Sequence, residues 1–262
     1  MHYTRFDGPD PILSLNSAGA RFHMDMHVHD EFVIAGYFGG TKAFIAGGRD
    51  GRASAGDFLV IAPGVPHAAR SHGDEGCTYL AIYPTLEQMA ALTGLQTTEV
   101  EQRLAGSCLF HAGDGGTALG SALADIFADT GDLAGPGLAA LASELLDRAD
   151  GAAPARVAVP GSLQTVWERI HDDPAARLDL EELSRLAGLS REHLCRSFRA
   201  AFGISPFQLL RARRTALARA LVSQGTSLAE AAAMAGFADQ SHMTRWFQRI
   251  YGVTPGAIGR YQ

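Results

Sequence analysis

The sequence lacks the features of a membrane-bound, exported or disulfide-linked protein. It has no run of about 18 uncharged apolar residues, and its start, MHYTRFDGPD, does not have the charged-then-apolar layout of an export signal. The three cysteines, Cys77, Cys108 and Cys195, are odd in number, lie far apart and form no CxxC pair, which argues against a disulfide framework or a zinc ribbon. We therefore expect a soluble cytoplasmic protein with no membrane partner.

Motifs of nucleotide and covalent chemistry are also missing. The sequence contains no P-loop, no GxGxxG after a strand pattern and no Ser/His/Asp order in the required context. We therefore expect no catalytic residues and no required cofactor.

Basic residues are unevenly distributed, and the C-terminal part has no lysine. Residues 163–262 contain 13 arginines and 9 acidic residues, a net charge of +4, whereas residues 1–162 contain 9 basic and 19 acidic residues, a net charge of −10. Together these give the −6 of the whole chain. Because 262 residues is about twice the common domain size, we expect two domains with different tasks, and the basic one weakly favours a polyanion as partner.

The predicted elements fall into three parts. Short apolar or alternating runs broken by glycine in residues 12–83 predict antiparallel all-β structure, and two Ala/Leu-rich segments within 117–149 predict paired helices. The stretch ADGAAPARVAVPG has no helical period and is typical of a linker. We therefore predict an α+β multidomain chain, with one domain at 1–150, a linker at 151–162 and an all-α domain at 163–262.

The all-α domain contains an internal repeat. LCRSFRAAFGISPFQLL begins at Leu194, and MTRWFQRIYGVTPGAIG begins 49 residues later at Met243, with arginine, phenylalanine, glycine and proline at equivalent places. DLEE at Asp179 and SLAE at Ser227 fit capping boxes, and each opens a short helix that is followed by a Gly-containing turn and a second cap. The order helix, tight turn, helix occurs twice, and in such a unit the second helix enters the DNA major groove.

Residues 206–222 connect the two helix-turn-helix units, with Pro206 in a first helical turn and no helix breaker between it and Gly225. A helix of this length spans roughly 25 Å and could hold two recognition helices about one DNA turn, roughly 34 Å, apart. We expect Trp246, Phe198 and Phe247 to lie in the core and the arginines of this helix to lie near the DNA backbone. These arginines are Arg211, Arg213, Arg214 and Arg219.

The segment GFADQSHMTRWFQRIYGVTPGAI resembles the signature of the AraC/XylS family of bacterial transcription regulators. The resemblance implies promoter binding by the twin unit, with double-stranded DNA as partner, and we expect RNA polymerase as a further partner. Arginine suits a DNA-facing helix because its fork can bond guanine O6 and N7 together or clamp a phosphate. The DNA-contacting candidates are Glu192, Cys195, Arg196 and Arg199 in the first unit and Gln240, Ser241, His242 and Arg245 in the second.

HVHDEFVIAGYFGG and GDFLVIAPGVPHAA resemble the two β motifs of the cupin family, which place side chains inside a small antiparallel β-barrel. His27 and His29 supply the first motif's HxH, and His67 supplies the histidine of the second. Val33 stands where enzymes of this family keep a carboxylate, and AraC-type sensory domains often keep such histidines without acting as enzymes. The three histidines either line an effector site, make structural hydrogen bonds or bind a divalent metal, and Tyr37 is a further effector-binding candidate.

We predict a transcription regulator, and specifically an activator, that is not an enzyme. The cupin-like barrel would bind a small effector, helices within 117–149 would pair two subunits into a homodimer, and the C-terminal units would bind a promoter. One alternative is a metal-dependent cupin enzyme or a metal-sensing regulator that uses the three histidines. Another is a protein-interaction module built on the Ala-rich helices.

Overall fold

The chain forms two compact units in the computed structural model. The described residues are 2–6, 12–128, 136–149 and 159–258. The first unit consists of Met1–His23, Asp30–Val65 and Ala69–Ala155, and the second of Met24–His29, Pro66–Ala68 and Arg156–Gln262. Two short segments of the N-terminal half are therefore grouped with the C-terminal helices. Among the described residues, no helix has the length and apolar character that crossing a membrane requires.

Most of the predicted linker, 151–162, lies outside the described residues. Its last two residues already belong to α5 (Gly161–Asp172), because Pro160 stands at the N-cap position and starts the helix there. The domain boundaries that we placed around this linker stay a prediction.

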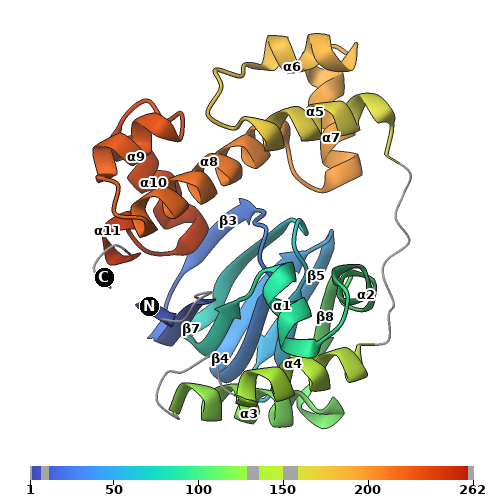
Figure 1. The fold of residues 1–262 in the computed structure, drawn as a ribbon, viewed down its shortest axis with the longest axis vertical. Helices are drawn as coiled ribbons and strands as arrows, with labels where there is room; N and C mark the ends of the chain where they lie inside the picture. Colours follow the sequence, from blue (N-terminus) through green and yellow to red (C-terminus); the bar gives the residue numbers. More distant parts are fainter. Residues whose placement is uncertain (1, 7–11, 129–135, 150–158, 259–262) are drawn as a thin grey trace. The chain divides into compact units, whose positions relative to one another are not determined.

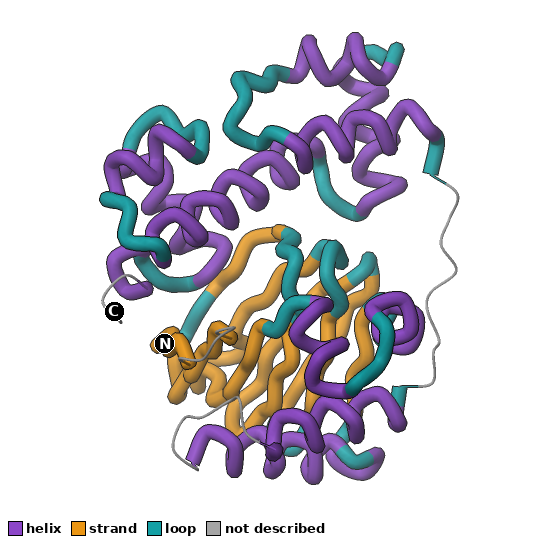
Figure 2. The backbone as a smooth tube through the Cα atoms, in the orientation of Figure 1, coloured by secondary structure: helices purple, strands orange, loops and turns teal. Residues whose placement is uncertain are grey.

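The N-terminal half forms an antiparallel β-sheet, shown in Figures 1 and 2. Its strands are β1 (His2–Phe6), β2 (Ile12–Ala20), β3 (His23–His27), β4 (Val33–Ala46), β5 (Arg49–Ser54), β6 (Phe58–Ile61), β7 (His67–Tyr83) and β8 (Ser107–Phe110). The main path of hydrogen-bonded neighbours is β1-β2-β7-β4-β6-β8, with β3 paired to β7 and β5 paired to β4. The antiparallel β structure predicted for residues 12–83 is confirmed.

Strand β4 changes partner at a glycine. Residues 33–36 pair with β6, and residues 41–46 pair with β5. Between them Gly40 has a left-handed φ of 67°, and a Cβ at this position would collide with the backbone carbonyl of Gly76 on β7. Glycine is therefore required where these two long strands approach each other, and the local turn of the backbone shifts the inward-facing phase of β4 by one residue.

Helices complete the core of this unit. They are α1 (Leu86–Thr93), α2 (Thr97–Arg103), α3 (Gly116–Ala128) and α4 (Pro136–Arg148). Helix α3 packs on β4, β6 and α4, and α4 packs on α1 (Figure 1). The core cluster joins Phe58 and Val60 of the sheet to Leu138, Leu141 and Leu145 of α4. The paired helices predicted within 117–149 are confirmed, and their apolar stripe faces the core of their own subunit.

The C-terminal residues form the two predicted helix-turn-helix units. Their helices are α5, α6 (Leu180–Ala187), α7 (Arg191–Phe202), α8 (Pro206–Ser223), α9 (Leu228–Met234), α10 (Gln240–Tyr251) and α11 (Pro255–Ile258). Side chains that accept a backbone N–H start five of these helices, at Asp179, Ser190, Ser205, Ser227 and Asp239. Left-handed glycines at Gly203 and Gly252 end the two recognition helices α7 and α10.

The capping boxes differ in part from those predicted. Asp179 caps α6, but the Glu182 carboxylate lies near Arg169 instead of closing back on the cap's backbone. Ser227 caps α9 and donates its hydroxyl hydrogen to Glu230. A complete capping box forms at the start of α8, where Ser205 and the residue three positions on bond reciprocally.

Helix α8 connects the two helix-turn-helix units without a break. Its 18 residues span about 27 Å, and it ends one residue beyond the predicted 206–222. Figure 1 shows α5 and α7 near its first half and α9, α10 and α11 near its second half. The Arg214 guanidinium donates to the carbonyls of Pro174 and Ala176, both at 2.8 Å, and so fixes the loop between α5 and α6. Arg214 thus has a structural role, and the DNA-backbone contact that we expected of it stays a prediction.

Candidate nucleic-acid interface and effector site

Helix α10 presents the polar face that the sequence predicted. Gln240, Ser241 and Arg245 are exposed, whereas Met243 and Phe247 are buried against α8 and α9. The polar side chains are therefore available to a partner while the apolar ones fix the orientation of the helix. This arrangement suits a helix that enters the major groove.

His242 has a partner within α10. The indole Nε1–H of Trp246 donates to His242 Nε2 at 2.9 Å. Burial is the main cause that lowers the pKa of His242, and the neighbouring Arg245 charge lowers it further, so the ring is neutral and its Nε2 accepts. His242 therefore positions Trp246, and a base contact from its other ring nitrogen stays a prediction.

Trp246 carries two arginines on its ring. The guanidinium of Arg211 lies 4.3 Å and that of Arg249 lies 5.0 Å from the Trp246 centroid. Trp246 is half-buried and packs against the core with its remaining surface, so the prediction of a core residue is only partly right. Arg249 also lies 3.8 Å from Asp25. This cluster was not predicted from the sequence, because Arg211 comes from α8 and reaches Trp246 only after folding.

Helix α7 repeats the layout of α10. Glu192, Arg196 and Arg199 are exposed and Cys195 is half-buried. The apolar side of α7 rests on α5, where the rings of Trp167 and Phe202 stack with centroids 4.6 Å apart. The DNA-contacting candidates of the first helix-turn-helix unit therefore all lie on α7, and those of the second helix-turn-helix unit all lie on α10. The role of Trp167 was not predicted, although the helical spacing of apolar residues in SLQTVWERI was a usable signal.

The three predicted histidines come together. His27, His29 and His67 are buried, with 3%, 4% and 7% of their surface exposed, and one ligand atom of each lies within 4.8 Å of the others. The ring centroids of His27 and His67 are 4.3 Å apart. His27 Nδ1 lies 2.7 Å from the carbonyl oxygen of Asp25, which can only accept, so Nδ1 carries the proton and Nε2 keeps the lone pair.

This histidine cluster has the chemistry of a metal site. Burial, followed by the nearby His27 ring and Arg219, keeps the pKa of His29 well below its usual value, so that ring is neutral and can act as a ligand. A His27 Nδ1–H that donates to a backbone carbonyl is the usual outer support of a metal-binding imidazole. Three neutral imidazoles suit zinc or nickel, and no carboxylate joins them among the described residues.

Tyr37 belongs to a different buried cluster, in the first unit. This cluster surrounds Lys42, whose Nζ lies 4.5, 5.5 and 5.6 Å from the ring centroids of Tyr79, Tyr37 and Phe22. Burial lowers the pKa of Lys42 to about 8, while the nearby Cys77 raises it. The structure thus places one predicted effector residue, Tyr37, beside a lysine that the sequence analysis did not select.

The phase shift at Gly40 explains why Lys42 was missed. Simple alternation along β4 would place Tyr37 and Lys42 on opposite faces of the strand. The glycine in left-handed conformation shifts the phase, so that residues 33–37 and then Lys42, Phe44 and Ala46 are buried. Lys42 is also the single lysine of the sequence, which was an available signal.

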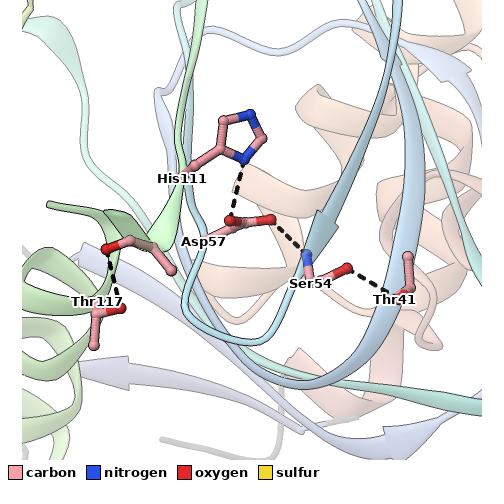
Figure 3. Close-up of polar contacts among 6 residues, drawn as sticks. Thr41, Ser54, Asp57, His111 and Thr117 are labelled. Carbon is pink, nitrogen blue, oxygen red and sulfur yellow. Dashed lines mark hydrogen bonds and ion pairs between the residues drawn. The ribbon is translucent and has the colours of Figure 1, made fainter. Parts of the chain in front are cut away.

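A polar network secures the β5–β6 turn of the first unit (Figure 3). Asp57 accepts the backbone N–H of Ser54 at 2.8 Å, and its other carboxylate oxygen lies 3.3 Å from His111 Nδ1. The Ser54 hydroxyl meets that of Thr41 at 3.1 Å. The buried carboxylate of Asp57 is thus engaged with its own turn and with the segment before α3.

Two family descriptions match this chain. Residues 13–183 match the AraC-like ligand binding domain, and residues 183–260 match a helix-turn-helix domain. The transcriptional regulator YbfI of Bacillus subtilis is 40% identical over 81 residues, which is 31% of this chain and 30% of YbfI. GlxA of Rhizobium meliloti, also a transcriptional regulator, is 35% identical over 108 residues, 41% of this chain and 31% of GlxA. These matches span about a third of the length of each relative.

The fold is similar to that of ToxT from Vibrio cholerae. The crystal structure of the apo ToxT K231A variant superposes with a TM-score of 0.57 at 12% identity and covers 94% of this chain and 95% of ToxT. Ligand-binding and helix-turn-helix descriptions together cover nearly all of the described chain, and the named relatives are regulators and not enzymes. The chain therefore belongs to the AraC family of DNA-binding transcriptional regulators.

Proposed function

We propose that the chain binds promoter DNA in a sequence-specific way and that a small effector, bound by its N-terminal half, controls this binding. The observation that carries the proposal is the equivalence of Arg196 and Arg245. Both are exposed, both lie on the second helix of a helix-turn-helix unit, and both units pack on α8. An effector acts here by having different affinities for DNA-competent and incompetent arrangements of the protein.

The recognition helices supply two kinds of contact in this proposal. Arg196 and Arg245 read base edges, because each can form two hydrogen bonds to one guanine. Arg211 and Arg249, stacked on Trp246, hold a phosphate in this proposal. Burial, followed by the like charge of Arg249, lowers the pKa of Arg211. Exposed Gln240 and Ser241 add adaptable polar contacts.

Substitution of the equivalent arginines tests the proposal. Bound sites are first selected from random duplexes, and affinity is then measured from about 50 to 200 mM salt. Arg245→Ala should weaken binding by about 1–3 kcal/mol and relax sequence choice at one position, and Arg196→Ala should do the same at another. Arg103→Ala is the control, because it removes the same charge from a half-exposed site on α2, where Arg103 pairs with Glu99. A salt-independent affinity, or an equal loss in the control, would contradict the proposal.

A metal-sensing regulator is a second candidate, and the histidine cluster favours it. Elemental analysis of the purified protein should then give one divalent ion per chain, and His67→Ala should remove it. His72→Ala is the matched control, because His72 is an exposed histidine on β7. A protein that holds no metal at neutral pH, even after incubation with zinc or nickel, would leave His27, His29 and His67 as structural or effector-contacting residues.

Homodimerisation and activation complete the proposed function. We propose that the outer faces of α3 and α4 pair two subunits and that the bound dimer favours engagement of RNA polymerase. Light scattering at micromolar concentration should give twice the chain mass, and a monomer mass would contradict the dimer. Transcription from a selected site should rise in the presence of the regulator, whereas a fall would identify a repressor.

A further inference from the structure

We propose that Lys42 and Tyr37 bind the carboxylate of a small organic acid whose apolar part packs on the rings around Lys42. The inference rests on the proposed function, because it names the chemical class of the effector. It adds to that function a specific anchor, a charge and a pH dependence.

The positive charge of Lys42 is unusual because it is buried. The chain has 21 arginines and this one lysine, which lies in the middle of β4 with 5% of its surface exposed. Lysines are almost never buried unless a partner compensates their charge. Within the described part of the chain, the Lys42 ammonium makes no ion pair and no hydrogen bond, and its recorded neighbours are three aromatic rings and a thiol.

The aromatic rings hold the ammonium without neutralising it. Contacts to Tyr79, Tyr37 and Phe22 attract a cation through the ring faces, but they replace only part of the hydration that burial removes. The carboxylate of Asp57 is engaged with Ser54 and His111. The Lys42 ammonium is therefore not neutralised by a carboxylate of the described residues, and a bound anion would neutralise it.

Tyr37 supplies a second donor within the same cluster, with its ring centroid 5.5 Å from Lys42 Nζ. Its hydroxyl is buried and has no hydrogen-bond partner among the described residues. Burial, followed by the Cys77 and Asp57 charges, raises the pKa of Tyr37 well above its usual value, so the hydroxyl keeps its proton and can donate. A buried ammonium and a buried hydroxyl in one aromatic cluster favour a group that only accepts, and a carboxylate offers two such oxygens.

The single charge and the surrounding aromatic rings indicate the charge and the polarity of the ligand. One buried positive charge is balanced by one negative charge, which favours a monocarboxylate over a phosphate or a dicarboxylate. The rings of Tyr37 and Tyr79 lie 5.6 Å apart and those of Phe22 and Tyr79 lie 5.7 Å apart, so the surroundings of the carboxylate are apolar and aromatic. The ligand is therefore an acid with an aromatic or aliphatic body.

The geometry also sets the pH dependence of binding. The titratable groups that face Lys42 are Cys77, Tyr37 and Tyr79, and burial raises the pKa of the Cys77 thiol, so this group adds no negative charge near neutral pH. A bound carboxylate favours protonated Lys42. Affinity should stay constant from about pH 6, where the carboxylic acid is ionised, to about pH 8, and fall by about tenfold per pH unit above that.

The single lysine makes a direct test possible. Protein labelled with ¹³C at the lysine ε-carbon gives one lysine signal, which is titrated with carboxylates from benzoate to palmitate, each paired with its neutral amide. We expect at least one acid, and not its amide, to shift the signal and raise the apparent pKa of Lys42. Lys42→Met should abolish binding of that acid, and Tyr37→Phe should weaken it about tenfold. Arg52→Met, at an exposed site on β5, is the matched control and should bind normally.

Several outcomes would overturn the inference. These are no shift with any acid at millimolar concentration, equal binding of acid and amide, stronger binding of phenyl phosphate, or an equal shift with acetate, which would indicate a simple anion contact. DNA binding by Lys42→Met without added acid separates this inference from the proposed function. If that variant binds selected sites normally while no acid binds wild type, only the acid site is wrong.

Discussion

At the scale of single residues, two positive charges with different surroundings differ in their effect on the stability of the fold. Arg245 is exposed on α10 and its charge stays hydrated until a partner arrives, so it costs the fold little. Lys42 is buried among aromatic rings and its charge destabilises the fold at neutral pH. A protein that keeps such a residue gives up stability at that position, and the binding of an acid would recover part of it.

Substitution of Lys42 by methionine should therefore stabilise the protein without ligand. The Lys42 pKa of about 8 lies below the usual lysine value of 10.5, so the unfolded state binds more protons between these two pH values. The destabilisation is full below pH 8 and disappears as the pH rises toward 10, which corresponds to about 3 kcal/mol. Lys42→Met should raise the free energy of unfolding by about this amount at pH 7 and by little near pH 10, as measured by urea denaturation. An equally large difference between variant and wild type at both pH values would contradict the buried charge.

Sequence patterns predicted some of these residues and could not predict others. Arg196 and Arg245 were identified because the repeat places them at equivalent positions, and His27, His29 and His67 because two motifs contain them. Lys42 was not predicted as a site residue, because the surroundings of a strand residue come from distant strands. In addition, Gly40 shifts the alternation of buried and exposed residues along β4. The contact of Arg211 with Trp246 was not predicted for a related reason, since the two residues lie 35 positions apart in the sequence.

At the scale of elements, local signals decided which boundaries were predictable. Helix α8 was placed to within one residue because Pro206 and Gly225 bracket it. Helices α1 and α2 and strand β8 were not predicted, because they are short and have no extended apolar period. The apolar stripe of α4 predicted a helix correctly but did not reveal what covers it.

Packing of α4 gives a prediction that separates folding from dimerisation. Leu141 has 2% of its surface exposed and lies in the core of the first unit. Leu141→Ala should lower the free energy of unfolding by about 2–5 kcal/mol because it leaves a cavity. Ser143→Ala, at an exposed position of the same helix, should change it little. If Leu141→Ala instead leaves stability unchanged and only shifts a dimer to monomers in light scattering, the stripe faces a partner subunit and the internal packing is wrong.

At the scale of the whole molecule, the proposed reading of DNA depends on the geometry of α8. The two recognition helices belong to units that pack on opposite halves of this helix, so its length and helical phase fix their separation and their relative rotation. Each residue of α8 adds 1.5 Å and about 100°. A twin unit can read two successive major grooves only if both quantities fit the pitch of the duplex.

Insertion of one alanine after Ala216 should therefore disturb DNA reading more than folding. The insertion lies between Leu209 and Leu210, buried in the first half of α8, and Ala218 and Val222, buried in the second. It rotates one unit against the other by about 100°, so the two helices can no longer enter adjacent grooves on one face of the DNA. Affinity for a full selected site should fall to that of a site with one half scrambled, while circular dichroism keeps its helical signal. Unchanged affinity for the full site would mean that the two helix-turn-helix units bind independently. In that case α8 would connect them without fixing their spacing or relative rotation.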